Sequence, residues 1–189
     1  EYAAAEELRE RERSMRQAQE LANLGSWRID LDTGTVDASP TAHRIYGLPE
    51  GPLTLGQIKS IPLAAYREKL DAALYNLIHH GQPYNVEFEI RRPSDGELRH
   101  IHSVADYDAE QNVVVGTLQD ITERTRAKEM LREEREQYST ITELSPIGIT
   151  TVNADGVITY ANSAAERILG LQRDQITSRT YDAPEWEHT

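Results

Sequence analysis

The stretch GTLQDITERTRAKEML, residues 116–131, changes character in its middle. Its first half reads as a strand, whereas its second half is rich in arginine, lysine and glutamate and reads as a helix. Thr122 is placed to begin this helix, because its hydroxyl can accept hydrogen bonds from free amides of the first turn. Glu123 follows at the positive end of the helix dipole, and Asp120 lies just before the helix. The sequence therefore predicts a strand that leads directly into a polar helix, with no flexible loop between them.

The chain also matches itself at an offset of 123 residues. At this offset the tripeptide LRE at 8–10 recurs at 131–133, and RIYGL at 44–48 pairs with RILGL at 167–171. We interpret this as one complete unit followed by the first half of a second one. The predicted organisation is a connector helix at 1–23, a complete domain at 24–123, a second connector helix at 122–144, and a truncated second domain at 145–189.

Both predicted connector helices carry a narrow apolar seam. The apolar residues recur at heptad spacing, but Glu134 and Gln137 interrupt the second seam. A seam of this kind is typical of a weak two-stranded coiled coil, so we expect a parallel homodimer about these helices. The alternative is a solvated linker helix held by pairs of glutamate and arginine. The seam residues are Leu8, Met15, Ala18 and Ala22 in the first helix and Ala127, Met130, Ile141 and Leu144 in the second.

The complete unit alternates strands and helices in an order that predicts an α+β fold. Ser39 and Pro40 are typical of a helix start, and Gly47 is typical of its end. The Pro- and Gly-rich passage at 48–62 predicts at most short helical turns, and 63–81 predicts the main amphipathic helix. We expect a five-stranded antiparallel sheet with helices covering one face. The predicted strands are 26–31, a short strand around Val36, 84–92, 97–107 and 112–121.

Two motifs resemble a known family. GTLQDITER at 116–124 is similar to the end of a PAS domain, also called a PAS/PAC sensor domain. NADGVITYANSAAERILGL at 153–171 is similar to the beginning of one. The resemblance implies a tandem sensory and dimerisation segment of a signalling protein, upstream of a histidine kinase or a diguanylate cyclase. It also implies that Asp120, Ile121 and Thr122 relay a signal from the sheet to the connector helix. The output domain cannot be read from these residues, which contain no phosphoacceptor histidine motif and no nucleotide-binding lobe.

Composition narrows the possible partners. The net charge of −12 argues against nucleic acid and against an anionic membrane surface, because both require basic patches. No apolar run approaches the roughly 20 residues that span a bilayer, so we expect no membrane contact by this segment and a cytoplasmic location. The absence of cysteine excludes disulfides and any cofactor tethered through sulfur.

A ligand pocket between the sheet and its helices is the main candidate site. A filled hydrophobic core is the alternative, because apolar stripes usually pack on one another. By resemblance, haem-binding relatives carry a histidine early in the main helix, and residues 66–74 supply none. We therefore expect no cofactor, although a non-covalent flavin stacked on Trp27 stays open. The pocket candidates are Trp27, Tyr46, Leu55, Ile58, Leu74, Ile78, Phe88 and Leu118.

Catalysis has little support in the sequence, and we expect no enzyme in this segment. His100 and His102 lie two apart on one predicted strand, with Asp106 beyond them, so they face the same way and could offer ligands to a metal. We interpret them, together with His79-His80 and the pair Glu87 and Glu89, as solvated side chains. Two alternatives to the sensory module stay open: a protein-interaction scaffold without ligand, and a metal-dependent enzyme that uses His100 and His102.

Overall fold

The computed structural model describes residues 10, 17, 19, 22–184 and 186, so most of the predicted connector helix at 1–23 lies outside the described residues. The chain divides into two compact units, Glu1–Arg126 and Ala127–Thr189, and each is considered by itself. Within the described part of the chain, no helix has the length and apolarity needed to cross a membrane.

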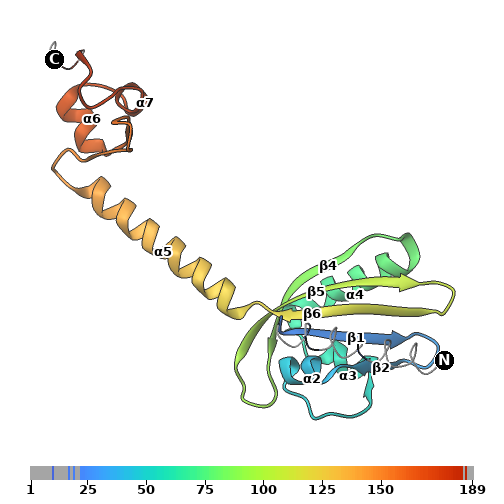
Figure 1. The fold of residues 1–189 in the computed structure, drawn as a ribbon. Coiled ribbons are helices and arrows are strands. Elements are labelled where there is room, and N and C mark those ends of the chain that lie inside the picture. Colours follow the sequence, from blue (N-terminus) through green and yellow to red (C-terminus); the bar gives the residue numbers. More distant parts are fainter. Residues whose placement is uncertain (1–9, 11–16, 18, 20–21, 185, 187–189) are drawn as a thin grey trace. The chain divides into compact units, whose positions relative to one another are not determined.

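The first unit contains one antiparallel sheet (Figure 1). Side chains alternate across it as a half-buried strand requires: Val86, Phe88 and Ile90 are buried, whereas Glu87 points away from the core. The sheet order is β3-β2-β1-β6-β5-β4. The strands are β1 (Leu24–Asp30), β2 (Thr35–Ala38), β3 (Leu53–Thr54), β4 (Tyr84–Arg91), β5 (Leu98–Asp108) and β6 (Val113–Asp120).

The α+β fold class is confirmed, but the predicted number of five strands is wrong. The sixth strand is β3, which pairs Leu53 and Thr54 with Val36 and Thr35 of β2. Two residues are too few to show an alternating pattern, and they lie in the Pro- and Gly-rich passage where only helical turns were expected. The sheet is therefore one short edge strand wider than the sequence pattern indicates.

Three helices lie against one face of this sheet (Figure 1): α2 (Pro40–Tyr46), α3 (Leu55–Ser60) and α4 (Ala64–His80). The predicted start of α2 is confirmed, because Ser39 Oγ accepts from the amide of Ala42 at 3.3 Å and Pro40 occupies the first turn. The predicted ends are also confirmed: Gly47 and Gly81 both adopt the left-handed conformation that terminates a helix. α3 begins with a capping box between Thr54 and Gln57.

Two glycines let the layers approach closely. A Cβ on Gly25 of β1 would lie 2.7 Å from the Cα of Ala42, so α2 could not sit this near to the strand with any larger residue there. A Cβ on Gly116 of β6 would overlap the indole ring of Trp27. The indole of Trp27 therefore packs directly against Gly116 of β6 and lines the space between the sheet and the helices.

A single residue, Ile121, separates β6 from helix α5 (Thr122–Leu144), so the strand leads almost directly into the helix, as the sequence predicts. Its first turn belongs to the first unit and its later turns to the second. The second unit continues with the two-stranded sheet of β7 (Thr150–Val152) and β8 (Ile158–Ala161), followed by α6 (Ser163–Leu169) and α7 (Arg173–Thr177).

Asn162 organises the second unit. Its side chain is fully buried and makes four hydrogen bonds of 2.7–2.9 Å: Nδ2 donates to two carbonyls and Oδ1 accepts from the amides of Ile149 and Ala165. Ser39 occupies the same place in the first unit, where its Oγ accepts from the amides of Ser26 and Ala42. The two carbonyls bonded by Asn162 Nδ2 belong to Thr142 and Ile147. The end of α5 is thus fastened to the strand and helix that follow it.

Candidate functional site

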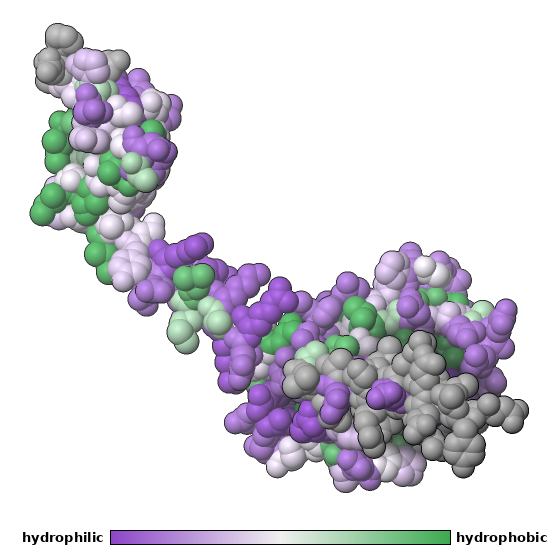
Figure 2. All heavy atoms as spheres, viewed as in Figure 1, coloured by the Kyte–Doolittle hydropathy of each residue, from purple (hydrophilic) through white to green (hydrophobic). Residues whose placement is uncertain are grey.

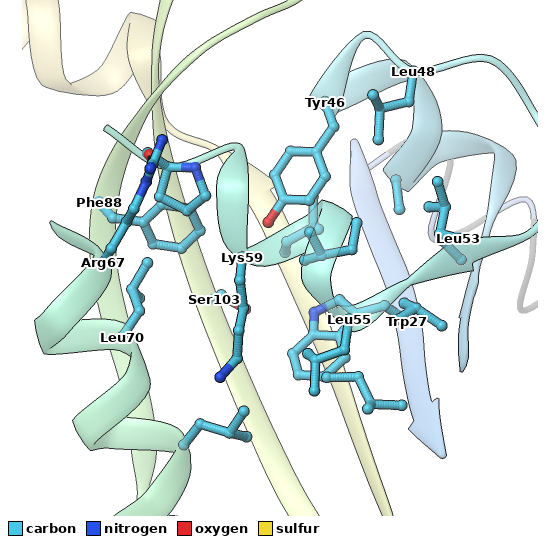
Figure 3. A pocket seen from close by; sticks show the side chains of 18 of the residues that line it. Trp27, Tyr46, Leu48, Leu53, Leu55, Lys59, Arg67, Leu70, Phe88 and Ser103 are labelled. Carbon is cyan, nitrogen blue, oxygen red and sulfur yellow. Dashed lines mark hydrogen bonds between the residues drawn. The ribbon is translucent and has the colours of Figure 1, made fainter. Parts of the chain in front are cut away.

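A cavity of about 80 Å³ lies between the sheet of the first unit and its helices (Figure 3). Its walls come from every layer, because all six strands, β1 to β6, supply the floor and α2, α3 and α4 supply the roof. The lining includes seven of the eight residues proposed from the sequence: Trp27, Tyr46, Leu55, Ile58, Leu74, Phe88 and Leu118. The eighth, Ile78, packs instead against the core around Ile29 and Leu77 and does not line the cavity.

The cavity also contains polar groups that sequence reasoning missed. His43 and Ser103 both line it and are buried. Ser103 Oγ donates to the carbonyl of Thr117 at 2.9 Å, so its hydrogen is used within the sheet. His43 lies three residues before Tyr46 on α2, a spacing that brings both to one helix face and that could have been read from the sequence.

The hydroxyl of Tyr46 points into the cavity (Figure 3). Burial raises the pKa of Tyr46 far above its usual value, so the hydroxyl stays protonated and can donate a hydrogen bond at physiological pH. Burial also raises the pKa of Tyr84, to about 12, with the charge of Asp71 as a second cause. Both phenols are neutral donors at the edge of an apolar space.

Among the described residues that line the cavity, the lysine, arginine and aspartate side chains lie where α3 and α4 meet. Lys59 Nζ of α3 lies 2.8 Å from Asp71 Oδ1 of α4, and both side chains are about half exposed. Arg67 Nε donates to the carbonyl of Pro62 at 2.9 Å and Arg67 Nη2 to that of Ser60 at 2.7 Å. These bonds hold the short helix α3, which buries none of its own residues, against α4.

A flavin does not fit this cavity. Pockets that hold drug-sized ligands measure about 300–1,000 Å³, several times the space here. Trp27, the proposed stacking residue, already meets the ring of Tyr84 edge-on, with centroids 6.4 Å apart and planes at 77°. Residues 66–74 of α4 contain no histidine to ligate a haem iron. The arrangement suits a much smaller guest.

The junction of β6 and α5 is bonded to the neighbouring strand. The amide of Ile121 donates to the carbonyl of His100 on β5 at 2.8 Å, and the amide of His100 donates to Thr122 Oγ1 at 2.9 Å. Asp120 Oδ1 accepts from the amide of Thr122 at 2.9 Å and from its hydroxyl. Asp120 Oδ2 lies 3.6 Å from Nη1 of Arg99, which also belongs to β5. Both sides of the junction are therefore fixed to one strand.

The expected role of the Thr122 hydroxyl is wrong. It accepts from β5 and donates to Asp120, and does not bond to the amides of its own helix. The side chain is 1% exposed, so the group has no access to further partners in water. The carboxylate of Asp120 takes over the bond to the amide of Thr122, the first of the helix.

The histidines proposed as metal ligands each have a partner. Nδ1 of His100 lies 3.5 Å from Oε1 of Glu89, and Nε2 of His102 lies 2.8 Å from Oδ1 of Asn85 on the adjacent strand. Across the described ranges, no three His, Cys, Asp or Glu side chains come together as a metal site.

Comparison with known proteins places this fold. Two family models, both of the PAS fold, match residues 35–118 and 136–184. The chain belongs to the PAS family of sensor domains. A sensory box histidine kinase/response regulator from Burkholderia thailandensis has a solved PAS-like structure that is 26% identical, with a TM-score of 0.55. That match covers 66% of this chain and 96% of the other.

Curated relatives of this PAS chain are signalling proteins. It is 23% identical over 164 residues to hybrid signal transduction histidine kinase I of Dictyostelium discoideum, covering 85% of this chain and 9% of that protein. It is 24% identical over 151 residues to sensor protein FixL of Bradyrhizobium diazoefficiens, covering 78% of this chain and 30% of that protein. The chain therefore spans less than a third of either relative. It is a PAS sensor module of the kind found in signalling proteins.

Proposed function

We propose that this chain senses a signal in the cavity of its first PAS unit and relays it through Asp120, Ile121 and Thr122 to α5, within a signalling protein of the histidine kinase or diguanylate cyclase type. One observation carries the proposal: only Ile121 lies between β6 and α5, and this junction is bonded to β5 at both the amide and the carbonyl of His100. A strand displacement therefore reaches the helix without passing through a loop.

The path from cavity to helix is short. Leu118 lines the cavity and lies two residues before Asp120 on the same face of β6. Pressure on Leu118 moves the strand relative to β5, which changes the contacts of Asp120 with Arg99 and of Thr122 with His100. Because a helix is stiff, a small tilt or rotation at its first turn reaches its far end.

We further propose that the chain is a tandem of two PAS domains, the second represented by its first half. The two matches to PAS family models support this. So do Ser39 and Asn162, because the side-chain oxygen of each accepts a hydrogen bond from the backbone amide three residues later. A Cβ on Gly148 would lie 3.2 Å from the Cα of Ala165, which parallels the close approach of Gly25 to Ala42 in the first unit. The predicted boundaries 24–123, 122–144 and 145–189 describe this arrangement.

A parallel homodimer through α5 is the proposed assembly. Figure 2 shows mainly hydrophilic side chains along α5 with apolar ones between them. The exposed apolar residues include three of the predicted seam positions, Met130 at 69%, Ile141 at 66% and Leu144 at 80%. Burying these against a second copy would remove apolar surface from water and stabilise the dimer.

The relay is tested by breaking α5. Proline at Ala127 and Met130 removes backbone donors and should uncouple the output domain of the full-length protein from its PAS units. The matched control is Ala127→Ser with Met130→Leu, which changes the same positions and keeps the helix. We expect altered autophosphorylation or cyclic-dinucleotide synthesis in the proline variant and ordinary activity in the control. Equal activity in both would refute the relay.

A protein-interaction scaffold is the second candidate. On the outer face of the sheet, Val104 and Val115 are 37% and 41% exposed on adjacent strands. Aspartate at both positions should abolish association through this face and leave the cavity intact. If this variant no longer signals, whereas variants with a filled cavity still do, then signalling depends on the outer face of the sheet. The proposed sensing role of the cavity would then be refuted.

A further inference from the structure

Two polar side chains of α2, those of Tyr46 and His43, line the cavity. Tyr46 is 8% exposed and His43 is 5% exposed, and both lie on α2. Nδ1 of His43 is buried and forms no hydrogen bond to a described residue. The hydroxyl of Tyr46 points into the cavity (Figure 3) and has no hydrogen-bond partner among the described residues. A polar group that is enclosed by protein and has no hydrogen-bond partner is unfavourable. A guest that accepts a hydrogen bond from the Tyr46 hydroxyl gives this group a partner, which favours binding.

The remaining lining favours an uncharged guest. Most of it is aliphatic or aromatic, and an ion transferred into such surroundings loses its hydration. The charged groups at the rim are engaged elsewhere: Lys59 pairs with Asp71, and the guanidinium of Arg67 donates to two backbone carbonyls. No single charge is therefore directed at the interior by the described side chains.

The volume sets the size of the guest. An apolar cavity of about 150 Å³ in another protein holds benzene, which has six non-hydrogen atoms. The cavity here, of about 80 Å³, is roughly half as large. It suits a molecule of about three to five non-hydrogen atoms, with small adjustments of the side chains around it.

We infer that the cavity binds a small uncharged alcohol or ketone, whose oxygen accepts a hydrogen bond from the hydroxyl of Tyr46 and whose short carbon chain packs beside Trp27 and Leu118. This inference rests on the proposed sensing role of the first unit and adds the chemical class of the signal. The contact with Leu118 would connect occupancy to β6 and so to the junction at Asp120.

Fluorescence of Trp27 provides a direct test in the full chain. Trp27 and Trp186 are its two tryptophans, so Trp186→Phe leaves only the one that lines the cavity. Straight-chain alcohols from methanol to octan-1-ol, and butan-2-one, are titrated into this variant. We expect saturable changes that are tightest for propan-1-ol, butan-1-ol and butan-2-one, and at least tenfold weaker for octan-1-ol, which is too long for the cavity.

Tyr46→Phe then removes the proposed donor. Losing one neutral hydrogen bond should weaken butan-1-ol binding about three- to tenfold. Tyr75→Phe, at a 56% exposed tyrosine on α4, is the matched control and should bind as before. If Tyr46→Phe does not fold, Leu74→Phe at a half-buried lining position fills the cavity from α4 and should abolish binding of every probe.

Three results would overturn the inference. Affinity that rises steadily up to octan-1-ol would indicate adsorption to apolar surface, and unchanged butan-1-ol binding in Tyr46→Phe would remove the role of the hydroxyl. No response of Trp27 to any probe would mean that none of these molecules enters the cavity. The proline test of α5 does not depend on these titrations, so failure here leaves the relay itself standing.

Discussion

The hydroxyl of Thr122 can be removed almost without changing the shape of the side chain. Thr122→Val replaces this hydroxyl by a methyl group of similar size at a site that is 1% exposed. The amide of His100 then loses its acceptor, now 2.9 Å away, and Asp120 Oδ1 loses one of its two donors from residue 122. The junction between β6 and α5 loses its bond to β5 on one side, whereas the bond from Ile121 to the His100 carbonyl remains.

The expected cost follows from these bonds. A buried donor without a partner costs about 1–3 kcal/mol, and the lower half of this range applies because His100 is only partly buried. We therefore expect the free energy of unfolding of the first unit to fall by about 1–2 kcal/mol. For a domain of this size each kcal/mol lowers Tm by about 4–8 °C, so the shift should be about 5–15 °C.

Thermal unfolding followed by Trp27 fluorescence measures this shift, and hydrogen exchange at the amide of His100 measures the local effect. Thr125→Val is the matched control, since Thr125 lies one turn later and its hydroxyl bonds to none of the described residues; its Tm should change little. Equal Tm values and equal exchange rates in both variants would show that the hydroxyl does not fasten the junction, and the relay argument would lose its main support.

Two predictions concern the second unit. Hydrogen bonds from the hydroxyl and amide of Ser163 hold the pKa of Glu143 at about 2, below its usual value of 4.5. Because the folded pKa is the lower one, the stabilisation is fully present above about pH 4.5 and is lost as the pH falls towards 2. Unfolding monitored by Trp186 should show this slope, and Glu143→Gln should flatten it; identical slopes would contradict the assignment. Asn162→Ser keeps a side-chain oxygen that can accept two hydrogen bonds, as Ser39 does, but loses the two bonds that Nδ2 donates. We expect the free energy of unfolding, measured by chemical denaturation, to fall by about 1–3 kcal/mol. The decrease should be smaller than for Asn162→Ala.

The regular elements of the first unit could be predicted because their signals are local. The main helix was expected at 63–81 and spans Ala64–His80, where an apolar stripe and Gly81 define it. In contrast, β3 is too short for a pattern, and its partner β2 lies across a helix in the sequence. The capping box of Thr54 and Gln57 was visible as a T-x-x-Q spacing and could have located α3.

The candidate site was predictable in its apolar part and not in its polar part. Seven of the eight proposed residues line the cavity because apolar side chains on the inner faces of strands and helices converge there. Ile78 belongs to the same stripe of α4, but it lies one turn beyond Leu74 and packs against the core around Ile29 and Leu77 instead. The sequence alone indicates that the hydroxyl of Thr122 caps its own helix, because it does not show that the amide of His100 on β5 lies within hydrogen-bonding distance.

The bonds at the junction also determine where this module can be recombined. The amide of Thr125 donates to the carbonyl of Ile121 at 2.9 Å, and this bond joins the first turn of α5 to the junction. In a chimeric protein, a fusion point between Asp120 and Thr122 would take the Asp120 carboxylate from one protein and residue 122 from the other, so their hydrogen bonds could be lost. A fusion point after Thr125 would keep the whole junction and the sheet to which it is bonded in the same protein. Chimeras that join this input to a foreign output should therefore inherit the first helical turn from the PAS unit, and only the later turns from the new partner.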